Sequence, residues 1–331
     1  MDMAAVRVLL VGAGGMGRAH LRNLLALRDV EIAGIVDPSS AAIATTKHIS
    51  GAVESTPEFS SLKAALEAVQ ADAAVIVTPH AEHFEQGQMC LQRGLHVLME
   101  KPFVAGSVNA RALIEMAQQA GRHLAVSYQR RLQGPYVYLK TLIESGELGE
   151  IRYATAYQAQ SWLESQRGTW RQNRELSCGG QLNDSGSHLV DVMLWLIGRQ
   201  PKSVFAHTDN RGTEVDIDSA LTIRFEHDVI CTLNVVGSAS IQWWEDVAIH
   251  GSKGTALYRN GELLVAKGVH SELRPVAAED LPVTTNPDEN FIDLILGRIS
   301  APAATAESGY QVARLTEAAW ESSEQQRWIA F

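Results

Sequence analysis

Two residues that could move a proton lie close together in the stretch Ser177–Gly198, SCGGQLNDSGSHLVDVMLWLIG. Asp184 and His188 are four residues apart, and the apolar residues around them predict a helix. On a helix, residues four apart lie on one face, so the carboxylate and the imidazole would meet. Such a pair can act as acid and base near neutral pH. By itself it would also suit a hydrolase or an isomerase. A third acid, Asp191, is interpreted as an anchor for the helix.

Lys101 is a further candidate for chemistry. It follows the apolar run His96–Met99, which predicts a strand, and stands between Glu100 and Pro102. A cation near a reacting hydroxyl favours its ionised form. By position alone, Lys101 could equally be a solvated surface charge. Together with Asp184 and His188, it indicates chemistry at an alcohol oxygen.

A glycine-rich turn near the N-terminus must position any cofactor for this chemistry. The apolar run Val6–Val11 predicts a buried strand, and the residues after it read G-x-G-x-x-G before a helical pattern. Gly12 would allow the tight turn, Gly14 the approach of a pyrophosphate, and Gly17 close packing of helix on strand. The phosphate would lie at the helix N-terminus.

Asp37 adds context to this turn. It ends a second predicted strand, Val30–Val36, twenty residues after Gly17. An acid at this place would accept hydrogen bonds from the adenosine ribose hydroxyls and would repel a 2′-phosphate. The sequence therefore favours NAD over NADP, and a coincidental glycine turn with an unrelated Asp is the alternative.

Strands and helices then alternate as far as His123–Ser127, which predicts a doubly wound parallel sheet for residues 1–127. Such sheets bind ligands at the carboxyl ends of their strands. We therefore expect cofactor contacts from these ends and from His83, which would cap or pack at the cofactor loop. The expected cofactor residues are Gly12, Gly14, Gly15, Met16, Asp37, Thr78, Pro79, His83, Glu100, Lys101 and Gln129.

From residue 128 onward the pattern changes to that of an α+β domain. Strands such as Ile217–Phe225 and Val229–Val236 are joined by short connections, which predicts a large, mostly antiparallel sheet in residues 128–331. Asn286–Ile299 and Ala306–Glu324 predict two closing helices. The adjacent Trp243 and Trp244 are expected to point to opposite faces, one of them outward.

The segment Ser161–Leu176 contains Trp162, Trp170 and Arg171 just before the acid–imidazole stretch. Exposed tryptophan beside arginine can stack on a polyhydroxylated ligand, and both tryptophans could equally cover the sheet. Trp162 and Arg130 are predicted to contact the substrate.

Composition excludes several classes of function. The 331 residues carry a formal net charge of −10 and no basic run beyond Arg130-Arg131, which argues against nucleic acid. No apolar stretch approaches the roughly 20 residues of a membrane span, so we expect a cytoplasmic protein. Cys90, Cys178 and Cys231 form no CxxC pair, and no histidine cluster has metal spacing; we predict neither disulfides nor a bound metal.

Five motifs together form a recognisable set: GAGGMG at Gly12–Gly17, VTPHAEH at Val77–His83, MEKP at Met99–Pro102, GELGEI at Gly146–Ile151 and CGGQLNDSGSHLVD at Cys178–Asp191. With them the chain resembles, over nearly its whole length, the glucose-fructose oxidoreductase / inositol dehydrogenase / rhizopine catabolism (Gfo/Idh/MocA) family. The resemblance implies an N-terminal Rossmann domain and reversible hydride transfer between a nicotinamide cofactor and a sugar, inositol or related polyol.

The resemblance also implies roles for single residues. Lys101, Asp184 and His188 would act on the substrate hydroxyl, and Trp170-Arg171 resemble a pair that approaches the nicotinamide in some members. We expect His188 to take the hydroxyl proton while Asp184 orients the imidazole or contacts a neighbouring hydroxyl. Many members are dimers or tetramers built through the open face of the C-terminal sheet, so a homodimer or homotetramer is expected.

Three alternatives remain. An NAD-dependent glycosidase would use the same three residues to oxidise a sugar transiently and reduce it again. An imine or enone reductase of the same family would not need the Asp–His pair as a base. A non-enzymatic NAD sensor would need none of the three residues Lys101, Asp184 and His188.

Overall fold

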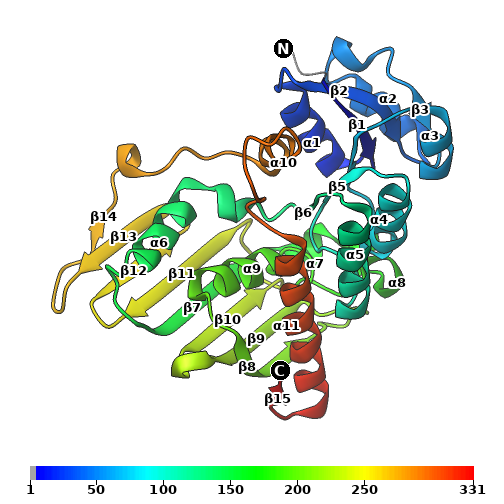
Figure 1. Cartoon of the computed structure of the whole chain (residues 1–331). Coiled ribbons are helices and arrows are strands. Elements are labelled where there is room, and N and C mark those ends of the chain that lie inside the picture. The colour runs from blue at the N-terminus through cyan, green and yellow to red at the C-terminus, as the bar shows by residue number, and fades with distance from the viewer. Residues whose placement is uncertain (1–4) are drawn as a thin grey trace. The chain divides into compact units, whose positions relative to one another are not determined.

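The computed structural model describes residues 5–331, which divide into two compact units (Figure 1). The first unit contains the chain up to Tyr128 together with Thr285–Tyr310. The second contains Gln129–Thr284 together with Gln311–Phe331. The predicted division, 1–127 and 128–331, therefore differs from the structure at Thr285–Tyr310, which returns to the first unit.

The first unit is built on a six-stranded parallel sheet with strand order β3-β2-β1-β4-β5-β6. Its central strands are apolar runs that are buried almost throughout, as expected for strands covered on both faces. The doubly wound parallel sheet predicted from the sequence is confirmed. The strands are β1 (Val6–Val11), β2 (Val30–Val36), β3 (Glu58–Phe59), β4 (Ala73–Ile76), β5 (His96–Met99) and β6 (Leu124–Val126).

The helices of this unit connect the parallel strands. Helix α3 begins at Leu62, because Phe59 belongs to β3 and the Ser61 hydroxyl caps the helix. The helices are α1 (Gly15–Leu25), α2 (Ser40–Lys47), α3 (Leu62–Ala68), α4 (His83–Gln92), α5 (Ser107–Ala120) and α10 (Pro287–Ile295). Phe291 and Ile292 of α10 share one apolar cluster with Leu21 and Leu24 of α1, which is why α10 joins this unit.

The second unit is built on a nine-stranded sheet with order β14-β13-β12-β11-β7-β10-β9-β8-β15. Only the β7–β10 pair is parallel among the described strand pairs of this sheet. The mostly antiparallel sheet is confirmed. The strands are β7 (Ile151–Ala159), β8 (Pro201–Asp209), β9 (Asp218–Phe225), β10 (Ile230–Val236), β11 (Trp244–Gly251), β12 (Gly254–Arg259), β13 (Glu262–Lys267), β14 (Arg274–Pro275) and β15 (Ile329–Ala330).

One face of this sheet is covered by helices and the other is open. Burial alternates along β10, β11 and β12, so every second side chain faces the covered side. Trp243 precedes β11 and Trp244 begins it, and both side chains are exposed, so the expected inward tryptophan is wrong. The helices of the unit are α6 (Gly134–Glu144), α7 (Trp162–Ser165), α8 (Arg174–Ser177), α9 (Gly186–Ile197) and α11 (Ala306–Gln325), the last of which crosses the unit boundary at Tyr310.

The stretch Ser177–Gly198 is not one continuous helix. Helix α8 ends at Ser177, and α9 runs from Gly186 to Ile197. Between them Cys178 takes the left-handed conformation, with φ 54°, and Gly179 has φ +150°, which stops the helix. Asp184 therefore lies in a turn ahead of α9, while His188 lies in the first turn of that helix. The predicted single helical face is wrong.

Within residues 5–331, no helix is long and apolar enough to cross a membrane. A cytoplasmic location stays a prediction.

Candidate functional site

The glycine turn of the first unit has the tight geometry that its sequence predicts. Gly12 has φ +105°, and a Cβ there would lie 2.6 Å from the Val77 carbonyl oxygen. A Cβ on Gly17 would lie 2.0 Å from the Gly12 carbonyl oxygen. Only glycine fits at these two positions. At Gly14 and Gly15 a Cβ would meet nothing within 4 Å, so the outer side of the turn is open to a ligand.

Helix α1 presents its N-terminus at this turn. No side chain caps the helix, its first turn holds no acidic residue, and the Met16 side chain is exposed. Uncapped N–H groups and the positive end of the helix dipole favour an anion there. The turn therefore fits the pyrophosphate of a dinucleotide, held by Gly14, Gly15 and Met16.

Asp37 follows β2 and lies beside the turn. Its Oδ2 accepts a hydrogen bond of 2.8 Å from the Ala13 amide, and its Oδ1 accepts one of 2.8 Å from the Ser39 amide. The two bonds fix the carboxylate, and each oxygen keeps a lone pair for a further donor. A pair of ribose hydroxyls is a suitable donor set for a carboxylate in this orientation.

His83 is fully buried and connects two loops of the first unit. Its Nε2 lies 3.0 Å from the Thr78 carbonyl oxygen, and its Nδ1 lies 3.0 Å from that of Pro102. Burial lowers the pKa of this imidazole. The expected packing of His83 at the cofactor loop is thus observed, while direct contact of His83, Thr78 or Pro79 with a cofactor stays a prediction.

Glu100 and Lys101 follow β5 at the same edge of the sheet as the glycine turn and Asp37. Glu100 is buried, and its Oε2 accepts a 3.0 Å hydrogen bond from the Lys101 amide. Lys101 is partly buried. Its position at a carboxyl strand end matches the prediction. The Glu100 side chain is buried, which does not favour contact with a cofactor. That contact stays a prediction.

In the second unit, the carboxylate of Asp184 is held by two residues from the preceding segment. The Trp162 indole Nε1 and the Arg171 Nε each donate to Asp184 Oδ2 over 3.1 Å. The Arg171 guanidinium also stacks on the Trp170 ring, 4.4 Å from its centroid. Trp162 is only 2% exposed and packs on Val215, so of the two alternatives for this tryptophan the structure shows the buried one. Trp162 orients Asp184, and contact with a substrate stays a prediction.

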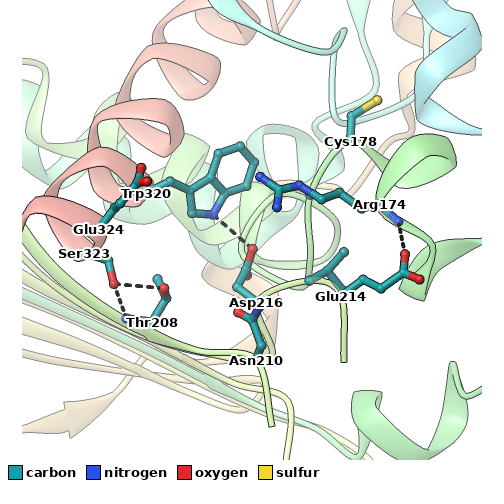
Figure 2. Close-up of a pocket in the computed structure, with 11 residues that line it drawn as sticks. Arg174, Cys178, Thr208, Asn210, Glu214, Asp216, Trp320, Ser323 and Glu324 are labelled. Carbon is teal, nitrogen blue, oxygen red and sulfur yellow. Dashed lines mark hydrogen bonds between the residues drawn. The ribbon is translucent and has the colours of Figure 1, made fainter. Parts of the chain in front are cut away.

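The loop that carries Asp184 is fixed by Asp216, which lies between β8 and β9. The Asp216 carboxylate accepts hydrogen bonds from the Gly180 amide (3.0 Å), the Leu182 amide (2.8 Å) and the Trp320 indole (2.9 Å), the last drawn in Figure 2. A Cβ on Gly180 would lie 1.9 Å from the Asp216 carbonyl oxygen, so the loop requires glycine there. Burial raises the pKa of Asp216, although the three donors partly oppose this.

His188 is buried in the first turn of α9, which itself is anchored by Asp191. Arg131 donates to Asp191 through Nε (2.9 Å) and Nη2 (2.7 Å). Burial raises the pKa of Asp191, and Arg131 only partly offsets this effect. The interpretation of Asp191 as a helix anchor is confirmed. The pair holds α9 to the turn Gln129–Leu132.

Arg130, predicted to contact the substrate, is buried and paired with Glu245 of β11. Its Nε lies 2.8 Å from Glu245 Oε1, and its Nη2 also donates to Glu245, whose carboxylate accepts a further bond from the Tyr136 hydroxyl. This places Arg130 in the link between the turn Gln129–Leu132 and the sheet. Substrate contact by Arg130 and cofactor contact by Gln129 stay predictions.

A cavity of about 480 Å³ lies in the second unit, and Arg174, Glu214, Asp216 and Trp320 contribute to its wall (Figure 2). Neither Asp184 nor His188 lines it, so it is separate from the candidate acid–base pair. Across residues 5–331, no group of three or more His, Cys, Asp or Glu side chains is arranged to hold a metal ion.

Sequence reasoning missed several residues that support the site: His20, Asp216, Glu245 and Asp288. Their partners lie far away in the chain; His20, for example, contacts Asp288 across 268 residues. For these residues the local sequence offers one signal, which is that His20 stands on the apolar side of α1. No spacing rule connects it to an acid on α10.

Family models match both units of the chain. One, described as an oxidoreductase family with an NAD-binding Rossmann fold, matches residues 6–128, and the other, a GFO/IDH/MocA C-terminal domain, matches residues 136–257. The chain belongs to the GFO/IDH/MocA oxidoreductase family. The resemblance inferred from the motifs is thereby confirmed, and so is the NAD-binding Rossmann fold of the first unit.

Relatives that are similar to the chain over most of its length are named for sugars and cyclitols. D-glucoside 3-dehydrogenase of Escherichia coli (strain K12) is 27% identical, covering 98% of this chain and 97% of the relative. The scyllo-inositol 2-dehydrogenase (NADP+) of Bacillus subtilis (strain 168) is 28% identical, covering 78% of each chain. A solved levoglucosan dehydrogenase in complex with NADH and L-sorbose has a TM-score of 0.88 at 20% identity, covering 99% of each chain, which shows the shared fold.

Proposed function

We propose that this oxidoreductase is an NAD-dependent dehydrogenase that oxidises a secondary alcohol of a sugar, inositol or related polyol. The observation that carries the proposal lies within the first unit. The glycine turn after β1, Asp37 after β2 and Lys101 after β5 all lie at the carboxyl edge of one parallel sheet. This edge is where such sheets bind dinucleotides, and Lys101 adds a cation suited to an alcohol oxygen. The names of the relatives support a sugar or cyclitol as the substrate.

The surroundings of Asp37 support NAD in preference to NADP. Its fixed carboxylate can accept hydrogen bonds from ribose hydroxyls, and its charge would lie near a 2′-phosphate. The next residue, Pro38, brings no positive charge to offset that repulsion. One relative is named as an NADP+ enzyme. The preference for NAD is therefore the first part of the proposal to test.

Three residues act on the substrate in this proposal. His188 takes the proton from the hydroxyl, Lys101 stabilises the negative charge that develops on the oxygen, and Asp184 orients the imidazole or a neighbouring hydroxyl. The bound nicotinamide supplies the hydride acceptor. Acid–base groups of this kind typically contribute roughly 10²–10⁴ in rate. Trp162 and Arg171 hold Asp184 for this work.

The open face of the nine-stranded sheet supports a homo-oligomer. Tyr153 of β7 is paired in register with Ile230 of β10, and both side chains are exposed on this face together with Trp244. Exposed apolar side chains on a sheet face are typical of an interface. A second copy of this chain is therefore the proposed occupant, as a dimer or as part of a tetramer.

The proposal is tested with a panel of inositols, aldoses and glucosides, each supplied with NAD or NADP, while reduced nicotinamide is followed by absorbance. We expect a polyol or sugar that yields NADH. Lys101→Ala and His188→Ala should each lose roughly 10²–10⁴ in kcat and still bind NADH, measured by fluorescence titration. Lys63→Ala, a change at an exposed lysine of α3, is the matched control and should keep full activity.

Full activity of Lys101→Ala or of His188→Ala would contradict the catalytic role proposed for the substituted residue. Cleavage of an aryl glycoside without net NADH would instead show the NAD-dependent glycosidase. Reduction of an imine or enone that survives both substitutions would show a reductase that does not need this acid–base set.

A further inference from the structure

Three buried ionisable side chains, Asp288, His20 and Glu100, are hydrogen-bonded in a row within the first unit. The row ends at Lys101. His20 of α1 lies between two carboxylates: its Nδ1 is 2.7 Å from Asp288 Oδ1, and its Nε2 is 3.3 Å from Glu100 Oε1. The exposed fractions of His20, Glu100 and Asp288 are 3%, 5% and 0%. Water therefore cannot replace these bonds.

The two carboxylates require a particular charge on His20. Ionised carboxylates only accept hydrogen bonds, so both ring nitrogens must carry a proton for both bonds to form. Burial alone would lower the pKa of His20, but Asp288 and Glu100 outweigh it and raise the pKa to about 10. Burial alone would raise the pKa of Glu100, but the bond from His20 and the charge of Lys101 lower it. At neutral pH both shifts favour an imidazolium at His20 beside an ionised carboxylate at Glu100.

The two ends of this row of side chains are fixed to different elements. Asp288 Oδ2 accepts a 2.8 Å bond from the Asn23 amide of α1, which holds α10 to the helix that begins at the glycine turn. At the other end, Glu100 Oε2 accepts the 3.0 Å bond from the Lys101 backbone amide. A rotation of the Glu100 carboxylate would therefore break this bond and release the Lys101 backbone amide. None of these contacts involves the second unit.

We propose that His20 and Asp288 are positioning residues that fix Lys101 through the Glu100 carboxylate; this rests on the role proposed above for Lys101. A carboxylate that is hydrogen-bonded to His20 through one oxygen keeps its other oxygen directed at the Lys101 backbone amide. The backbone from which the Lys101 side chain starts is thereby held in one position. His20 and Asp288 touch neither substrate nor cofactor in this scheme.

The test compares His20→Gln, which keeps a polar side chain of similar length but carries no positive charge between the two carboxylates, with the wild type. We expect kcat for the substrate found in the panel to fall roughly 10–100-fold, because small misplacements of a catalytic group have effects of this order. The KM and the dissociation constant for NADH should stay within about threefold. His96→Gln is the matched control, since His96 lies at the opposite end of β5 from Glu100.

A double-variant cycle separates this inference from the proposed function. If His20 acts through Lys101, His20→Gln should have little further effect on kcat in the Lys101→Ala background. Equal effects of His20→Gln in both backgrounds would overturn the positioning role and leave the proposed function intact. Full activity of Lys101→Ala would overturn the proposed function itself.

A measurement on the wild type covers the case in which His20→Gln does not fold. In protein labelled with ¹⁵N-histidine, the nitrogen shifts of His20 at pH 8 should show both ring nitrogens protonated. A neutral His20 ring at pH 8 would contradict the pair of charges on which the inference depends.

Discussion

At the level of single side chains, Asp184 takes its orientation from several parts of the second unit. Trp162 and Arg171 donate to the same carboxylate oxygen, and Asp216 fixes the loop through two backbone amides. In the first unit, Asp37 is held in the same manner by two amides of its own unit. Both acids are thus set in place by hydrogen bonds from within their own unit.

Asp37→Ala tests the coenzyme preference. A hydrogen bond to a charged group contributes about 1.5–3 kcal/mol, so the loss of even one such bond should raise the dissociation constant for NADH at least about 10–100-fold. That for NADPH should rise less or fall, because a repulsive charge is removed. Both constants are measured by fluorescence titration of the reduced coenzymes. The matched control is Asp72→Ala, which removes a carboxylate that accepts a 2.8 Å bond from the Arg7 amide at the opposite edge of the sheet. Tighter binding of NADP than NAD by the wild type would refute the role of Asp37.

His20 predicts how stability depends on pH. Its pKa is raised from 6.5 to about 10, so its contribution to stability is fully present below pH 6.5 and is lost as the pH rises toward 10. Each pH unit in this window removes up to about 1.4 kcal/mol. The melting temperature of the wild type should therefore exceed that of His20→Gln most at pH 6–7, and the gap should close by pH 10. A gap that is constant from pH 6 to pH 10 contradicts a charged His20.

At the level of elements, the segment between α8 and α9 depends on glycine. Gly180 passes so close to Asp216 that a methyl group cannot be placed, and the same contact sets the path of the chain to Asp184. Gly180→Ala should lower kcat by about 10²-fold, since a shift of about 1 Å in a catalytic group has this effect. NADH affinity should not change. Gly51→Ala is the control, because a Cβ there meets nothing within 4 Å. Equal kcat in Gly180→Ala and wild type would show that the loop does not set the position of Asp184.

The elements also show what local sequence could predict. The strand ends at Gly12, Asp37 and Lys101 follow from apolar runs and glycine spacing, because the periodicity of a buried parallel sheet is a local signal. The break before α9 does not follow from local sequence. The apolar pattern of Leu189–Leu196 favours a helix. However, the amides of Gly180 and Leu182 donate to Asp216, 36 residues beyond Gly180, and so do not form helical hydrogen bonds. The assignment of α10 to the first unit likewise depends on distant contacts of Phe291 and Asp288.

At the level of the whole molecule, the open face of the nine-stranded sheet predicts self-association. Tyr153→Glu with Ile230→Glu places two acids at paired positions of β7 and β10, where they would repel their counterparts in a second copy. Sedimentation should give a dimer or tetramer for the wild type and a smaller species for this variant. Val108→Glu, a change at a side chain that is 81% exposed in α5, should leave the assembly intact. A monomeric wild type would remove the proposed interface.

The central claim is that a hydride passes from a carbinol carbon of a polyol or sugar to the nicotinamide. Its most direct test is to supply NAD with inositol or glucoside deuterated at its ring carbons and to weigh the reduced coenzyme by mass spectrometry. The account predicts reduced coenzyme that carries one deuterium, formed at a rate that falls roughly 10²–10⁴-fold in His188→Ala. Reduced coenzyme without deuterium, or none with any member of the panel, would contradict it.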